Sequence, residues 1–127
     1  MAALPLNVFK TKTSILITAT NAVVYTAPVG VTAIILMANI ANVSGSSQLV
    51  TFSHYRNLPI LPDAQGNGAQ SANVATELVK NFSIPSDDSA NMLSGKMIVE
   101  NLDSIISYAS SPNSCKLVLS ILETANA

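Results

Sequence analysis

Charge is scarce in this sequence of 127 residues. Six lysine and arginine residues stand against seven aspartate and glutamate residues, and charged residues make up only 10% of the chain. An average soluble domain carries about 25%. The formal net charge is −1, so the chain lacks the basic surface that binding to nucleic acid requires. We therefore expect no nucleic-acid partner.

Cysteine, tryptophan and long hydrophobic runs are also rare or missing. The one cysteine excludes an intrachain disulfide framework. The longest apolar region, residues 27–43, is interrupted by proline, glycine, threonine and asparagine. It therefore falls short of the roughly 20 apolar residues of a membrane-spanning helix. Residues 1–12 lack the pattern of a signal peptide, and we expect no membrane association.

Hydrophobic residues nevertheless make up 49% of the chain, which excludes an intrinsically disordered protein. No charged residue occurs from Thr13 to Tyr55. A monomer with so few surface charges would be poorly soluble, because low net charge favours association. The composition therefore predicts a subunit of an assembly, with much of its surface covered by other protein.

Eight segments have the alternation and β-branched content of strands, with turn residues between them. They are residues 14–20, 23–26, 32–42, 48–55, 77–84, 96–100, 104–109 and 115–123. In the third segment, simple alternation places Ile34, Leu36, Ala38 and Ile40 on one face. No segment has a convincing helical period. The pattern predicts an all-β protein, an antiparallel β-sandwich of jelly-roll type with about eight short strands, and leaves an immunoglobulin-like strand order open.

We expect residues 1–12 to form an extended N-terminal arm and residues 13–127 to form a single β-sandwich domain. The arm and the long irregular stretch after Tyr55 each carry a cluster of apolar residues with proline. Such clusters mark interaction sites when they are exposed, and the alternative is that they fold back onto a sheet edge. The predicted interface residues are Leu4, Leu6, Phe9, Tyr55, Arg56, Leu58, Ile60 and Leu61.

Catalytic and metal-binding patterns are weak. His54 and Cys115 are the only nucleophile and base of the kind that cysteine catalysis requires, and nothing in their neighbourhoods marks them. Glu100 with Asp103 resembles an acid/base pair only superficially, and Asp87-Asp88 would need several more oxygen ligands to hold calcium. One histidine and one cysteine cannot build a zinc site. We expect no enzymatic activity, no metal and no cofactor.

Three stretches together resemble a group of small structural proteins of tailed-bacteriophage virions. The similarity spans residues 12–124, with one departure, since Leu102 stands where a glycine is expected before Asp103. The stretches are residues 24–36 (VYTAPVGVTAIIL) leading into 41–45, residues 50–53 with 54–56, and the series 95–100, 102–105 and 118–123.

The resemblance implies a non-enzymatic virion protein. Its first implied role is that of a capsid decoration or cement protein, which binds the shell as a homo-oligomer, with a trimer favoured and the major capsid protein as partner. A neck, tail or baseplate protein is the alternative. A β-sandwich module that binds glycan or peptide remains a third reading.

Overall fold

The computed structural model describes residues 7–16, 22–56 and 74–125. In these ranges the chain forms nine β-strands and no helix, so nothing in them is a helix long and apolar enough to cross a membrane. The strands are β1 (Asn7–Ile15), β2 (Ala22–Thr26), β3 (Val31–Asn42), β4 (Gln48–Arg56), β5 (Val74–Ile84), β6 (Ser89–Asn91), β7 (Met97–Val99), β8 (Ser104–Ala109) and β9 (Cys115–Ala125).

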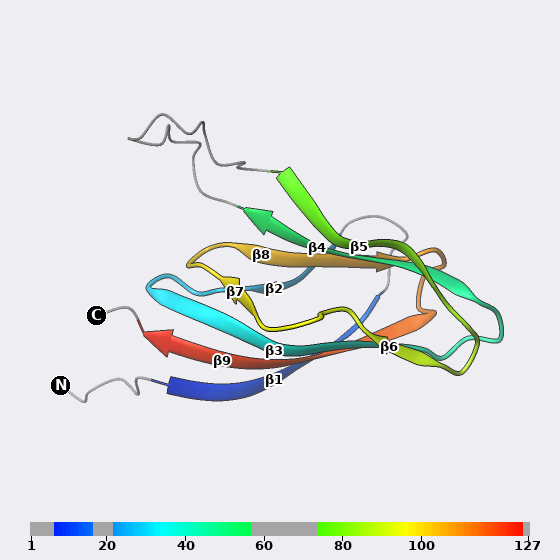
Figure 1. Ribbon diagram of the computed structural model, residues 1–127, viewed down its shortest axis with the longest axis horizontal. Coiled ribbons are helices and arrows are strands. Elements are labelled where there is room, and N and C mark those ends of the chain that lie inside the picture. Colours follow the sequence, from blue (N-terminus) through cyan, green and yellow to red (C-terminus); the bar gives the residue numbers. More distant parts are fainter. Residues whose placement is uncertain (1–6, 17–21, 57–73, 126–127) are drawn as a thin grey trace.

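The strands form two antiparallel sheets that face each other (Figure 1). The first sheet has the order β1-β9-β3-β6, with β7 also paired to β3, and the second has the order β2-β8-β4-β5. Because β6 and β7 pair with successive parts of β3, they act as one interrupted strand. The first strand lies beside the last, which is a jelly-roll order and not an immunoglobulin order, where the first strand neighbours the second.

Alternating apolar side chains of the two sheets fill the space between them. On β9, Leu117, Leu119 and Ile121 are almost completely buried, and Phe52 on β4 is the largest fully buried side chain. Residues between them, such as Val118 and Ser120, are only half-buried. The alternation of apolar residues in the sequence therefore corresponds to the side chains that fill the single core between the sheets. The predicted all-β sandwich is confirmed.

The expected alternation of β3 is wrong in its first half. The pairing of β3 with β9 shifts register between Ile35 and Met37, which is a β-bulge at Leu36. A bulge adds one residue and reverses the side to which the preceding residues point. Ile35 is therefore buried with Ala38 and Ile40, whereas Ile34 and Leu36 face outward.

Strand boundaries differ from the expected ones in three places. β1 begins at Asn7, so residues 7–12, which we expected in the arm, pair with β9. β5 begins at Val74 and not at residue 77, and β6 was not expected at all. Backbone pairing with an existing sheet stabilises these segments, although their residues show no alternation of buried and exposed side chains.

The turn between β7 and β8 contains the position where glycine was expected. Leu102 has a φ of 69°, in the left-handed region that leucine rarely adopts. The turn is held in place by backbone hydrogen bonds from Leu102 N to Ala27 O (2.9 Å) and from Asp103 N to Glu100 O (3.0 Å). The backbone thus keeps the conformation that suits glycine, and leucine adopts it at an energetic cost.

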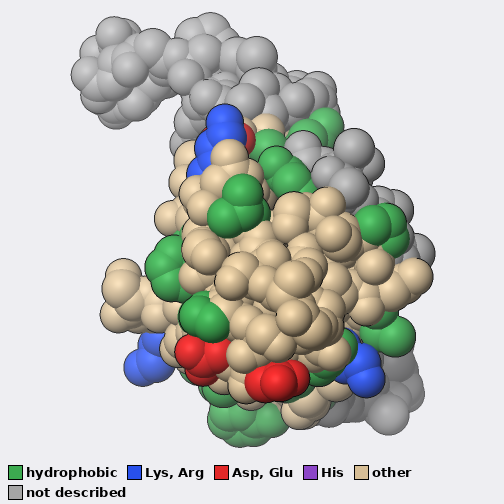
Figure 2. All heavy atoms as spheres, turned by 90° about the vertical axis from the view of Figure 1, so that its right-hand side faces the viewer, with side chains coloured by type: hydrophobic (Ala, Val, Ile, Leu, Met, Phe, Trp, Pro, Cys, Tyr) green, Lys and Arg blue, Asp and Glu red, His purple; other side chains and the backbone are tan. Residues whose placement is uncertain are grey.

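The turns at the opposite end of the sandwich are organised by one buried amide. The Asn42 side chain donates to the carbonyl oxygens of Ser46 (2.8 Å) and Ile84 (2.9 Å), and its oxygen accepts from the Ser44 N–H (2.9 Å) and hydroxyl (2.7 Å). Gln48 extends this network to Ser110 on the β8–β9 side. Figure 2 shows this end as a broad area of uncharged side chains and backbone, with charged groups towards its margins.

Candidate functional site on the outer face of one sheet

Four apolar side chains form a row across the outer face of the first sheet. Paired residues on neighbouring antiparallel strands point to the same side, so the register identifies the row directly. Phe9 on β1 pairs with Leu122 on β9, Leu122 pairs with Ile34 on β3, and Ile34 pairs with Ile98 on β7. We call these four residues the apolar row.

The two ends of the apolar row are its most exposed members. Phe9 is 74% exposed and Ile98 is 61% exposed, while Leu122 and Ile34 between them are half-buried. Leu36, at the bulge, adds a further exposed apolar side chain. A shallow hollow of about 360 Å³ beside the row is lined by Phe9, Lys10, Thr11, Leu36, Ser120 and Ile121.

Charge is nearly absent from this face. Apart from Phe9 and Met37, the described outward positions of β1, β9 and β3 carry threonine, serine, asparagine, alanine, aliphatic residues and one lysine. That lysine, Lys116, is the one charged side chain among these outward positions. An apolar row on a face with so little charge is costly to leave in water, because exposed apolar surface favours association. Exposed apolar surface of this kind favours contact with other molecules over contact with water.

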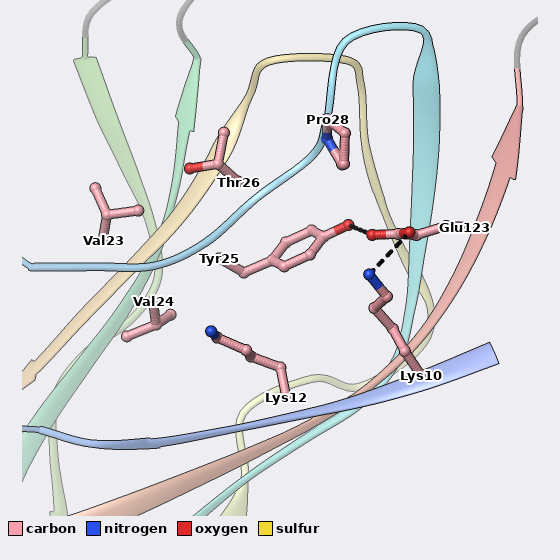
Figure 3. A pocket seen from close by; sticks show the side chains of 8 residues that line it. All are labelled: Lys10, Lys12, Val23, Val24, Tyr25, Thr26, Pro28 and Glu123. Carbon is pink, nitrogen blue, oxygen red and sulfur yellow. Dashed lines mark hydrogen bonds and ion pairs between the residues drawn. The ribbon is translucent and has the colours of Figure 1, made fainter. Parts of the chain in front are cut away.

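The same sheet places two lysines on its inner face. Lys10 and Lys12 pair with Ile121 and Leu119, whose side chains lie in the core, so both lysines point towards the second sheet. They line a hollow of about 370 Å³ between β1 and β2 together with Tyr25 and Glu123 (Figure 3). The sandwich is therefore open along this side, and every residue of β1 except Ser14 is exposed.

Tyr25 and Glu123 join the two sheets beside this hollow. The Tyr25 hydroxyl on β2 donates a 2.5 Å hydrogen bond to Oε2 of Glu123 on β9, and Lys10 Nζ lies 3.1 Å from Oε1 of the same carboxylate. Burial, followed by the hydrogen bond and the charge of Glu123, raises the pKa of Tyr25 well above its ordinary value. The hydroxyl therefore remains a neutral donor.

A second ionic cluster lies where β4 ends. Arg56 pairs with Glu100, and its Nη1 is 3.9 Å from Oδ2 of the fully buried Asp103. His54 Nε2 lies 3.6 Å from the same Asp103 oxygen. The Arg56 guanidinium therefore lies between the carboxylates of Glu100 and Asp103 and neutralises part of their charge.

The candidate catalytic residues do not come together. His54 lies near the C-terminal end of β4. Cys115 begins β9 and pairs with Asn42, the last residue of β3, just before the turn that leads into the opposite end of β4. Cys115 is buried, and burial raises the pKa of its thiol. Asp87 and Asp88 are exposed in the turn before β6, and no group of three metal-ligating side chains occurs in the described ranges.

The predicted interface residues are divided by the structure. Phe9 is strongly exposed, while Tyr55 and Arg56 are half-buried at the end of β4. Leu4, Leu6, Leu58, Ile60 and Leu61 lie outside the described residues. Sequence reasoning missed Leu122, Ile34 and Ile98, because only the strand order reveals that they lie in line with Phe9.

Comparisons with known proteins agree on the fold alone. No family model matches the chain, and no curated protein matches it. A solved structure from the Bacillus endospore appendages, a family of disulfide-linked pili, has a TM-score of 0.50 and 12% identity over 100% of this chain and 98% of its own. A chain of the T13 viral particle of IBDV has a TM-score of 0.52 and 6% identity over 96% of this chain. This chain spans only 32% of that viral protein.

Proposed function

We propose that this chain is a non-enzymatic structural protein of a virion, with capsid decoration as its role. The observation that carries the proposal is the apolar row on an almost uncharged sheet face. The role is mechanical, since a rigid sandwich supplies the scaffold and its exposed face is covered by neighbouring subunits.

The fold supports such a role. Structures similar in fold to this chain occur in the Bacillus endospore appendages and within part of a protein of a viral particle. The pilus family is disulfide-linked, whereas the single cysteine of this chain, Cys115, is completely buried. Copies of this chain would therefore be held together by non-covalent contacts.

Burial of apolar surface provides enough free energy to hold such subunits together without covalent bonds. At about 25 cal/mol per Å², an interface that hides roughly 800 Å² of mostly apolar area gains on the order of 15 kcal/mol before costs. Lost translational freedom and side-chain ordering remove much of this gain. Many copies on one shell make even a weak individual contact collectively strong. The proposed partners are other virion proteins, the major capsid protein first, with the chain acting as a homo-oligomer in the virion.

A neck, tail or baseplate position is the main alternative, because it uses the same rigid sandwich. The glycan-binding reading has less support. Its hallmark would be a cluster of exposed aromatic rings, but Phe9 lies on the edge of one sheet and Phe82, 48% exposed, lies on the far edge of the other.

Immunogold electron microscopy tests the proposed location. An antibody raised against the recombinant chain is applied to particles purified from the virus whose genome carries the sequence. Label distributed over the capsid is expected. Label restricted to the neck or tail would favour the alternative, and unlabelled particles would overturn the virion role.

A further inference from the structure

We propose that the apolar row is the contact between two copies of this chain, packed face to face about a two-fold axis that runs along the strands between β9 and β3. The inference rests on the proposed role as an assembly subunit and names the partner of that surface. The smallest oligomer is then a dimer, and not the trimer that the virion resemblance favours.

The free sheet edges are poor places for two copies to pair. Lys10 and Lys12 point inward from the edge strand β1, and inward-pointing charges on an edge oppose strand addition. If two β1 strands paired antiparallel about Thr11, Lys10 of one copy would lie directly opposite Lys12 of the other on the same face. Like charges in that position destabilise the pair.

The other edges are short or irregular. β5, the edge of the second sheet, shifts register twice against β4 and contains Asn81 with a φ of 51°. It also carries Glu77 and Lys80. β2 has five residues, and β6 and β7 have three each. Bulged, charged and short edges are protected against pairing, so a face of the sandwich is the better surface for self-association.

The size of the face is sufficient for a specific contact. β1 is nine residues long and the sheet is four strands wide, which gives a flat footprint of about 30 by 19 Å, or roughly 600 Å². Side-chain relief increases the accessible area beyond this footprint. The result approaches the roughly 800 Å² that each partner buries in a standard interface.

The proposed axis makes the row complementary to itself. Rotation about it places Phe9 of one copy over Ile98 of the other, and Leu122 over Ile34. The two most exposed side chains of the row thus cover each other, and the two half-buried ones meet at the centre. Such an isologous contact uses the same patch on both copies, with the strands of the two packed sheets within about 30° of each other.

Charge placement agrees with this axis. Lys116 on β9 pairs with Ala41 on β3, so the rotation places Lys116 of one copy over Ala41 of the other. Lys116 lies near the start of β9, six residues from Leu122, and its side chain is exposed. The two Lys116 residues of the dimer therefore lie one strand spacing apart on either side of the axis, at the end of the contact and not within the apolar row, where both side chains can extend into solvent.

Light scattering coupled to size-exclusion chromatography tests the contact. The native chain should have a mass near twice 13.2 kDa. Phe9→Asp and, independently, Ile98→Asp should each weaken self-association at least 100-fold. Val29→Asp is the matched control, because Val29 is 76% exposed but lies in the turn before β3, away from the row. Urea unfolding of each variant verifies that the fold is retained.

A short bis-maleimide defines the geometry. Cross-linking is expected in a mixture of Phe9→Cys and Ile98→Cys chains and not within either variant alone, since two Phe9 positions lie on opposite sides of the axis. The buried Cys115 does not compete. Cross-linking of Phe9→Cys to itself, a trimeric mass, or a dimer unchanged by both aspartate variants would overturn the inference.

The same samples separate this inference from the proposed function. A monomeric native chain that still binds purified shells would leave the virion role intact and assign the apolar row to another virion protein. A row-dependent dimer that is absent from particles would uphold the contact and contradict the role.

Discussion

The hydroxyl of Tyr25 on β2 donates its hydrogen bond to the carboxylate of Glu123 on β9, at 2.5 Å, and so joins the two sheets at their open side. Both residues are at most 9% exposed. Hydrogen bonds to a charged group contribute about 1.5–3 kcal/mol. We expect Tyr25→Phe to lower the free energy of unfolding by about 2 kcal/mol in urea titrations. Tyr108→Phe, a half-buried tyrosine on β8, is the control and should have a smaller effect.

The raised pKa of Tyr25 makes this stability pH-dependent. In the unfolded chain tyrosine loses its proton near pH 10, whereas in the folded protein Tyr25 keeps it to higher pH. The unfolded state then binds fewer protons, so stability is full below pH 10 and falls as pH rises, by up to about 1.4 kcal/mol per pH unit. Unfolding measured at about pH 9, 10 and 11 should show this extra loss in the native chain but not in Tyr25→Phe. Equal slopes for both chains would contradict it.

The two inward lysines should differ in their effect on stability. Lys10 lies 3.1 Å from Glu123, with its side chain 44% exposed, and pairs of this exposure contribute less than about 1 kcal/mol. Lys10→Met should therefore lower the free energy of unfolding by less than about 1 kcal/mol, and the difference should be smaller at high salt. Lys12→Met, two residues along the same face, serves as its control. A larger cost for Lys12→Met would show that the Glu123 pair is unimportant.

The Asn42 amide should be among the most sensitive polar side chains. It is 1% exposed, and its removal leaves the Ile84 and Ser46 carbonyl oxygens without its donors. The Ser46 carbonyl is on an exposed residue and keeps the Ser44 hydroxyl as a donor, so the Ile84 carbonyl is the buried group left unsatisfied, at about 1–3 kcal/mol. We expect Asn42→Ala to lower the free energy of unfolding by about 2–3 kcal/mol in thermal or urea unfolding. Asn39→Ala, on the outer face of the same strand, should cost far less.

The left-handed backbone conformation of Leu102 should favour glycine over alanine at this position. An L-residue in this conformation pays roughly 1–2 kcal/mol that glycine avoids. Comparing Leu102→Gly with Leu102→Ala removes the lost packing of the leucine from the comparison, because both variants lack it. Leu102→Gly should be the more stable of the two by about 1 kcal/mol. The reverse order would mean that the turn changes conformation in the variants.

Most of the fold could be predicted from the sequence because apolar and polar residues alternate clearly along the core strands. In β9, Leu117, Leu119 and Ile121 alternate with partly exposed residues, and the structure buries them as expected. The bulge at Leu36 could not be predicted, since it depends on how β3 pairs with β9 and not on β3 alone. The same holds for the first half of β1, whose exposed residues have no core pattern of their own.

The candidate site was predictable only in part. Phe9 could be selected as an isolated apolar residue near the N-terminus, but its three partners come from strands far away in the sequence. Leu122 and Ile34 have the hydrophobicity of core residues, and nothing local distinguishes the outward position from the inward one. The row is a property of strand order and register. It becomes visible only when the jelly-roll topology is known.

The copy number of this chain in purified particles decides whether it is a structural component of a virion. Quantitative gel densitometry against the major capsid protein should give on the order of hundreds of copies per particle, as repeated decoration of a shell requires. About six to a few dozen copies would indicate a ring at the neck or tail instead. Particles that contain no copies of the chain would show that it is not a component of the virion.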